Sequence, residues 1–112
     1  MNKVYTGSWS PEIYYKAINL DKHFAKHGDD FGLSGDPTDL VGKQQYVDMA
    51  VELINRESGV EKYSDTLHST IEVYERSTEK HVVGNADGQI ATLFKRSSTE
   101  IDANQERSIR LI

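Results

Sequence analysis

The sequence predicts an α+β fold, with N-terminal helices packed on a small twisted antiparallel β-sheet that runs as a meander. Apolar residues of the N-terminal half recur at helical spacing, whereas those after Gly59 alternate with polar residues as in strands. Short segments rich in turn-forming residues separate the expected strands. Because the helices come first and the strands follow, a meander is favoured over alternating βαβ units.

The first helix is expected to begin at Ser10-Pro11, because serine is a good N-cap and proline is favoured at the first helical position. Gly28 is expected to end it as a left-handed C-cap. At that end the helix dipole is expected to raise the proton affinity of His27. The apolar face follows helical spacing and comprises Ile13, Ala17, Leu20, Phe24 and His27.

Gly, Pro, Ser and Asp residues between positions 31 and 42 predict a loop, in which Phe31 turns back to the core. Helical spacing resumes from Lys43 to Arg56, and Gly59 closes that helix. The expected strands are 69–76, 80–84 and 89–95, with Tyr63 on a preceding strand and 109–112 as an edge strand.

Strand alternation separates the side chains of the sheet into two faces. The face expected to pack on the helices carries Ile71, Val73, Ala91 and Leu93. The face expected to stay open carries Glu72, Tyr74, Arg76, Thr92 and Phe94. Aromatic rings, a cation and hydroxyls on an exposed sheet face can hold unstacked nucleic-acid bases.

The composition limits the classes of function. A chain of 112 residues with 37% hydrophobic residues suits one globular domain, 1–112, with its core in 10–97 and with 1–9 and 98–112 peripheral. The absence of cysteine excludes disulfides and thiolate metal sites. No apolar run approaches a membrane span or a signal peptide. With a net charge of −5, nucleic-acid binding would need a local cationic site.

The densest group of candidate catalytic residues lies near the end of the first helix. Lys22, His23, Lys26 and His27 fall within two helical turns there. Histidine exchanges protons near neutral pH, and a neighbouring lysine supplies a fixed positive charge. This combination suits chemistry on a phosphate.

Two motifs carry a family resemblance: residues 20–32, which end in Lys-His-Gly-Asp-Asp-Phe-Gly, and residues 88–95, Gly-Gln-Ile-Ala-Thr-Leu-Phe-Lys. Over residues 21–95 the chain resembles the colicin D-like toxin domains and the toxin tips of contact-dependent growth inhibition. These belong to the barnase–EndoU–colicin–RelE-like class of ribonucleases. The resemblance implies an endoribonuclease that needs no metal or other cofactor. It also implies a tRNA substrate cut at or near the anticodon loop.

Matched to that family, His27 is the catalytic histidine, Lys26 its cationic neighbour and Thr92 the small hydroxyl residue. Phe94 stands where the family has tryptophan, and Lys95 matches the lysine that follows. A second basic position of the family falls on Phe24 here, and Lys22 and His23 are its possible substitutes. The expected substrate-binding residues are Lys22, His23, Phe94 and Arg96, together with Tyr74 and Arg76, which have no motif match and only share the open sheet face.

These residue types suit RNA cleavage by the ribose 2′-hydroxyl, which leaves a 2′,3′-cyclic phosphate and a 5′-hydroxyl. His27 would act as the base or the acid, and a positioned group of this kind contributes roughly 10²–10⁴-fold in rate. Lys26 and Lys95 would stabilise the charge on the phosphate, and Thr92 would donate a hydrogen bond to a phosphoryl oxygen.

The resemblance also implies the biological setting. The domain would be the C-terminal effector of a larger secreted toxin, monomeric, and active in the cytoplasm of a target cell. A cognate immunity protein would cover Lys26, His27 and Lys95.

Three alternatives remain open: a non-catalytic RNA- or protein-binding module, an acidic antitoxin or immunity-type protein, and a zinc site. The zinc site would use His23 and His27 with Asp29 and Asp30. The other two histidines, His68 and His81, are expected at the surface.

Overall fold

A computed structural model describes residues 17–65, 68–86, 88–104 and 109–111 of the chain. The described elements are α1 (Ala17–His27), a 3-10 helix η1 (Gly28–Phe31), α2 (Leu40–Asn55), β1 (Glu61–Asp65), β2 (Thr70–Glu75), β3 (Lys80–Asn85), β4 (Ile90–Lys95), α3 (Ser98–Asn104) and β5 (Ile109–Arg110). The predicted α+β fold is confirmed. The expected start of the first helix at Ser10-Pro11 lies outside the described residues.

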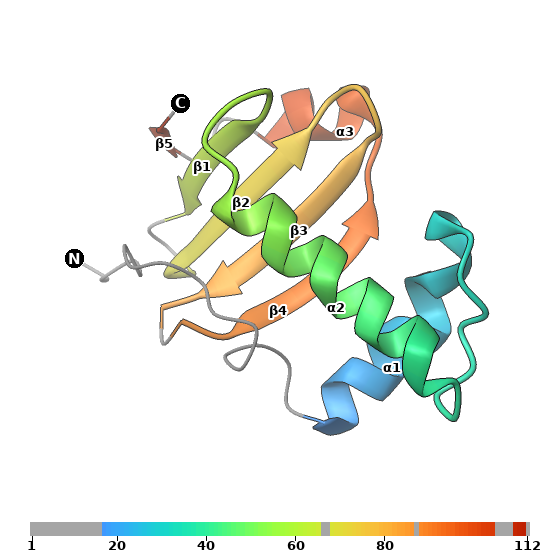
Figure 1. Cartoon of the computed structure of the whole chain (residues 1–112). Coiled ribbons are helices and arrows are strands. Elements are labelled where there is room, and N and C mark those ends of the chain that lie inside the picture. The colour runs from blue at the N-terminus through green and yellow to red at the C-terminus, as the bar shows by residue number, and fades with distance from the viewer. Residues whose placement is uncertain (1–16, 66–67, 87, 105–108, 112) are drawn as a thin grey trace.

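The strands form one antiparallel sheet in the order β4-β3-β2-β1-β5. Strands β1 to β4 follow one another as the predicted meander, and the predicted strand around Tyr63 is β1. Strand β5 pairs with β1 as a short edge strand, as expected for the C-terminus. In Figure 1, α2 crosses the front of the sheet, α1 lies beside the β4 edge, and α3 lies behind the sheet.

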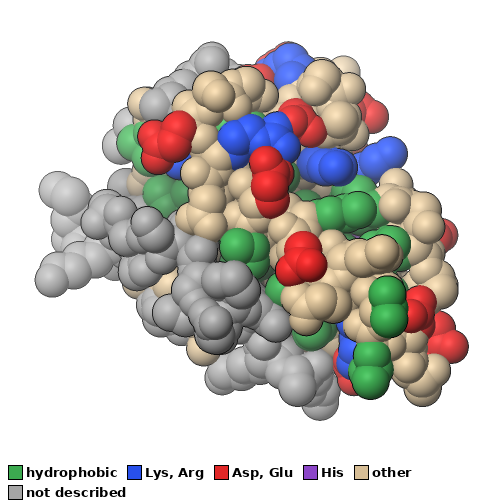
Figure 2. Space-filling model, in the orientation of Figure 1, with side chains coloured by type: hydrophobic (Ala, Val, Ile, Leu, Met, Phe, Trp, Pro, Cys, Tyr) green, Lys and Arg blue, Asp and Glu red, His purple; other side chains and the backbone are tan. Residues whose placement is uncertain are grey.

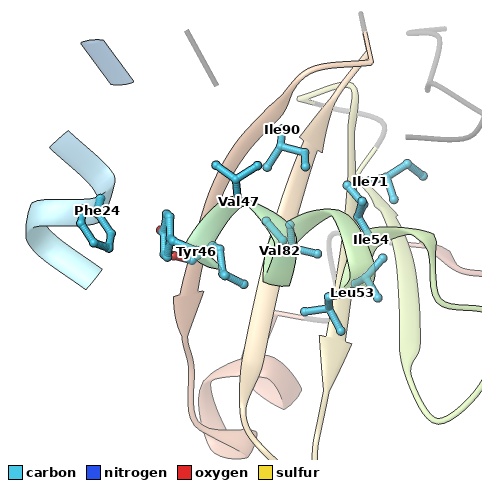
Figure 3. Packing of buried hydrophobic residues seen from close by; sticks show 11 residues of the cluster. Phe24, Tyr46, Val47, Leu53, Ile54, Ile71, Val82 and Ile90 are labelled. Atoms are coloured by element: carbon cyan, nitrogen blue, oxygen red, sulfur yellow. The ribbon is translucent and has the colours of Figure 1, made fainter. Parts of the chain in front are cut away.

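The core lies between α2 and the facing side of the sheet (Figure 3). Its α2 side chains are Tyr46, Val47, Ala50, Leu53 and Ile54, and its sheet side chains are Ile71, Val73, Val82, Ile90 and Leu93. Phe24 points from α1 toward Tyr46, and the two ring centroids are 5.6 Å apart. The Tyr46 hydroxyl donates to the backbone carbonyl of Leu93. The ring contact thereby holds α1 against α2, and the hydroxyl bond holds α2 against β4.

A β-bulge in β4 changes which residues of that strand reach the core. Val83 pairs with Thr92 but Gly84 pairs with Ile90, so Ala91 is an extra residue on β4. A bulge of this kind interrupts the alternation of side chains. Ile90 is therefore buried and Ala91 partly exposed, and the prediction that placed Ala91 in the core is wrong.

The opposite face of the sheet is covered in part by α3. Ile101 of α3 packs against Tyr63 and Tyr74, and Tyr74 is fully buried. The prediction of an open face at Tyr74 is therefore wrong. Residues 98–104 were expected to be peripheral, yet they contain this helix. Its sequence signal is the Ser97-x-x-Glu100 pattern of a capping box. The Glu100 amide donates to the Ser97 hydroxyl (3.2 Å), and that hydroxyl donates to the Glu100 carboxylate (3.1 Å).

The chain leaves α1 differently from the prediction. Gly28 is not left-handed and is the first residue of η1. A glycine is needed there because a Cβ would lie 2.9 Å from the Phe24 ring. The left-handed residue is Gly32, with φ of 74°. Helix α2 begins at Leu40, earlier than predicted, because the Asp39 carboxylate caps it by accepting from the Gly42 amide at 3.0 Å.

Candidate functional site

Helix α1 places His23 and His27 against β4, one helical turn apart. The His23 Nδ1 atom lies 3.1 Å from the Thr92 hydroxyl oxygen. The ring centroids of His27 and Phe94 are 5.7 Å apart. Because the two histidine rings are themselves stacked at 6.2 Å, the four side chains form one continuous group, which we name the α1–β4 cluster. The structure thus brings together four of the predicted site residues.

Both histidines of the cluster hold protons less tightly than a free imidazole. Burial lowers the pKa of His27 below its usual value, and the Lys26 charge lowers it further. Asp30, whose carboxylate lies 3.8 Å from the His27 Nδ1 atom, opposes this pKa shift only in part. The predicted rise in the proton affinity of His27 is therefore wrong, because desolvation outweighs the neighbouring negative charges.

The pKa of His23 is lowered for related reasons. Burial is the main cause, followed by the positive charges of His27, Lys22 and Lys26. At neutral pH both rings are therefore predominantly uncharged, and each can accept a proton.

The Phe94 ring is enclosed by three side chains. His27 contacts it from α1, and His81 of β3 lies with its ring centroid 4.9 Å away. The Arg96 guanidinium lies 4.8 Å from the ring centroid, as in a cation–π contact. Arg96, a predicted substrate-binding residue, therefore adjoins the α1–β4 cluster.

His81 is the residue that the sequence analysis missed. It was expected at the surface, but it is 1% exposed and lies between the rings of Tyr74 and Phe94. Its Nε2 atom is 3.3 Å from a Glu72 carboxylate oxygen, and among the described residues neither ring nitrogen has a hydrogen-bond partner. The hairpin turn could have indicated this position, since its length sets His81 opposite Tyr74.

The remaining predicted residues are not part of the cluster. Lys22 and Lys26 are exposed on α1 beside the histidines. Lys95 points to the α2 side of β4, opposite to Thr92 and Phe94, because side chains alternate along a strand.

Tyr74 and Arg76 lie in a separate group beneath α3. The Tyr74 hydroxyl donates to the Arg96 carbonyl at 2.8 Å. Arg76 donates to Glu61 at 2.6 Å and to Asp102 at 3.1 Å, and these carboxylates raise its pKa. Arg76 thus ties the start of β1 to α3, and its charge is already compensated.

In the part of the chain that the structure describes, no group of three or more His, Asp or Glu side chains is arranged to hold a metal ion. Among the same residues, no helix is long and apolar enough to cross a membrane. No protein-family model, curated protein or solved structure matches the chain.

Proposed function

We propose that this chain is a metal-independent endoribonuclease domain whose active site is the α1–β4 cluster. The observation that carries the proposal is the contact between His23 and Thr92, which are 69 residues apart in the sequence. The two motifs of the colicin D-like resemblance, residues 20–32 and 88–95, lie far apart along the chain. Folding puts a histidine of the first motif and the hydroxyl of the second within hydrogen-bonding distance.

The protonation state of the cluster fits the first step of RNA cleavage. A neutral imidazole of the pair, His27 in this proposal, takes the proton of the ribose 2′-hydroxyl, and the oxygen attacks the adjacent phosphorus. The bond from phosphorus to the 5′-oxygen then breaks, and that oxygen takes up the proton that His27 removed from the 2′-hydroxyl. The products are a 2′,3′-cyclic phosphate and a 5′-hydroxyl.

Charge stabilisation in this reaction comes from α1. Lys22 and Lys26 are exposed next to the histidines, and neither forms an ion pair with a residue that the structure describes. Preorganised cations of this kind stabilise the charge that develops on the phosphoryl oxygens. The Thr92 hydroxyl contacts His23, so its role in the proposal is to orient that ring.

The resemblance over residues 21–95 supports the rest of the proposal. The substrate is tRNA cut at or near the anticodon loop, and the domain is the effector of a larger secreted toxin that acts in the target-cell cytoplasm. A cognate immunity protein covers Lys26 and His27. The domain acts as a monomer.

The test is incubation of the purified protein with total tRNA in the presence of EDTA. Discrete fragments with 2′,3′-cyclic phosphate and 5′-hydroxyl ends are expected. His27→Ala should slow cleavage by about 10²-fold or more, because it removes one acid–base group.

The matched control is His68→Ala, which removes an exposed histidine that pairs with Asp65 between β1 and β2. It should cleave like the parent. Intact tRNA after incubation with the correctly folded parent would refute the enzyme and favour the non-catalytic binding module.

A further inference from the structure

A cleft of about 700 Å³ lies on the α2 side of the molecule, between η1 and the turn that joins β2 to β3. Phe31 of η1 and Met49 of α2 form its apolar wall, and Lys80 and Lys95 line it from the ends of β3 and β4. Figure 2 shows blue basic side chains beside a green apolar patch on the upper right of this face. A volume of roughly 300–1,000 Å³ is typical of sites for small ligands.

The two lysines face each other across neighbouring strands. Lys80 and Lys95 are directly paired in the register of β3 and β4, so both side chains stand on the same face of the sheet. Like charges directly opposite each other destabilise a sheet. A chain with a net charge of −5 therefore keeps two positive charges together at a cost in stability.

No described carboxylate forms an ion pair with either ammonium group. The residue opposite Lys80 on β2 is Glu75, but its carboxylate contacts Arg56 and Thr78 instead. Lys80 is near enough to Glu52 to help lower the pKa of that carboxyl, which is itself bound to Arg56 at 2.7 Å. Both lysine charges thus remain available to an anion.

The cleft adjoins the α1–β4 cluster through one residue. Asp30 lines the cleft, and its carboxylate is 3.8 Å from the His27 Nδ1 atom. An RNA strand whose reacting phosphate lies at His27 therefore has the cleft next to it. The carboxylates of Asp30 and Glu79, which also line the cleft, repel phosphate and confine it to the lysine side.

We propose that Lys80 and Lys95 bind a phosphate group of the substrate RNA next to the one that is cleaved, with the attached nucleotide against Phe31 and Met49. This inference rests on the proposed ribonuclease function. It adds a second binding point that lies on the α2 side of the sheet, outside the cluster.

The test measures binding of a short single-stranded oligoribonucleotide to the full chain carrying His27→Ala, so that the RNA stays intact. Lys80→Gln and Lys95→Gln should each weaken binding several-fold. In the double variant the slope of log affinity against log salt should fall by about 0.7, the value for one neutralised phosphate of a single strand.

The matched control is Lys62→Gln, the same change on β1, which β2 separates from β3. It should leave the affinity and the salt slope unchanged. Thermal unfolding provides a second measurement, because removal of one of two facing charges should raise the melting temperature of Lys80→Gln while its RNA binding falls.

The outcomes separate this inference from the proposed function. RNA binding by the double variant equal to that of Lys62→Gln overturns the cleft site, even if the parent cleaves RNA. Weakened binding in a protein whose parent cleaves no RNA supports the cleft site and overturns the ribonuclease.

Discussion

Phe94 connects two histidines of different elements, His27 of α1 and His81 of β3. His27 contacts its ring from α1, and His81 contacts the same ring from β3. The two histidines differ in their surroundings, since the His27 side chain is 19% exposed and that of His81 is 2% exposed. Only His27 can therefore meet a substrate without rearrangement of the sheet, whereas His81 acts as part of the interior.

The buried imidazole of His81 should cost stability. An unpaired polar group in the interior loses its hydration without a replacement hydrogen bond, at a cost of roughly 1–3 kcal/mol. His81→Phe keeps an aromatic ring between Tyr74 and Phe94 and removes both unpaired nitrogens. Urea unfolding should show a free energy of unfolding higher by about 1 kcal/mol.

The control for that substitution is His68→Phe at an exposed position, where the change in stability should be small. A His81→Phe protein less stable than the parent would contradict the argument. In that case the close Glu72 carboxylate would contribute more than the unpaired nitrogens cost.

The lowered pKa values of His23 and His27 predict a pH dependence of stability. In the unfolded chain both titrate near their usual pKa of about 6.5, and in the folded protein they titrate at lower pH. Between these values the unfolded state binds more protons, so the free energy of unfolding should fall as the pH is lowered below about 6.5.

The measurement is urea unfolding at about pH 7.5 and about pH 5.5, in the range where histidines titrate. The double variant His23→Gln/His27→Gln should lose less stability over this interval than the parent does. An equal loss in both proteins would show that other groups cause the pH dependence.

Among the elements, the turn between β2 and β3 places a residue other than glycine in the left-handed region, as does Ser69 just before β2. Glu79 has a φ of 63°, although a side chain in the left-handed region costs roughly 1–2 kcal/mol relative to glycine. The turn is held by hydrogen bonds from the Glu79 amide to the Glu75 carbonyl (2.8 Å) and from the Arg96 amide to the Glu79 carbonyl (3.0 Å). It also forms one wall of the cleft beside Lys80.

Glu79→Gly should therefore raise the free energy of unfolding by about 1 kcal/mol, because glycine adopts this conformation without strain. Thermal or urea unfolding measures the change. Ser77→Gly in the same turn is the control, since Ser77 has a negative φ and glycine there only adds freedom to the unfolded chain. Equal effects of the two substitutions would contradict the assignment of strain to Glu79.

At the scale of the whole molecule, charge is distributed unevenly although the chain is acidic. Arg56 and Arg76 are bound to carboxylates and join separate elements of the fold. In contrast, Lys22 and Lys26 on α1, and Lys80 and Lys95 at the cleft, form no ion pair with a described residue. The two pairs of free lysines lie on either side of His27 and Asp30, and the proposals for RNA depend on this local concentration of positive charge.

The face of the molecule that α2 covers carries charged side chains but no histidine of the α1–β4 cluster. In the view of Figure 2, which has the orientation of Figure 1, none of the chain's histidines is visible, whereas basic and acidic side chains are interspersed. The α1–β4 cluster and the cleft therefore open to different sides of the β4 edge. A substrate that used both would have to pass around that edge at η1.

Local sequence determined the secondary structure well. Helical spacing predicted α1 and α2, and alternation with turn residues predicted β2, β3 and β4 to within one residue at either end. These features depend on neighbours within a few positions, which is why they can be inferred without the fold. The sequence also led us to expect that the motif containing His27 and the motif containing Thr92 form one site, but only through the family resemblance.

Only the tertiary structure decided which surfaces are buried. Strand alternation grouped Tyr74 with Phe94 on one face. Helix α3 covers that face at Tyr74, whereas Phe94 is contacted by His27 of α1 and by Arg96. The bulge at Ala91 and the burial of His81 likewise depend on neighbouring strands. The physical reason is that periodicity determines only which side chains share a face. The burial and the pKa of those side chains depend on the segment that packs against the face, and that segment comes from elsewhere in the chain.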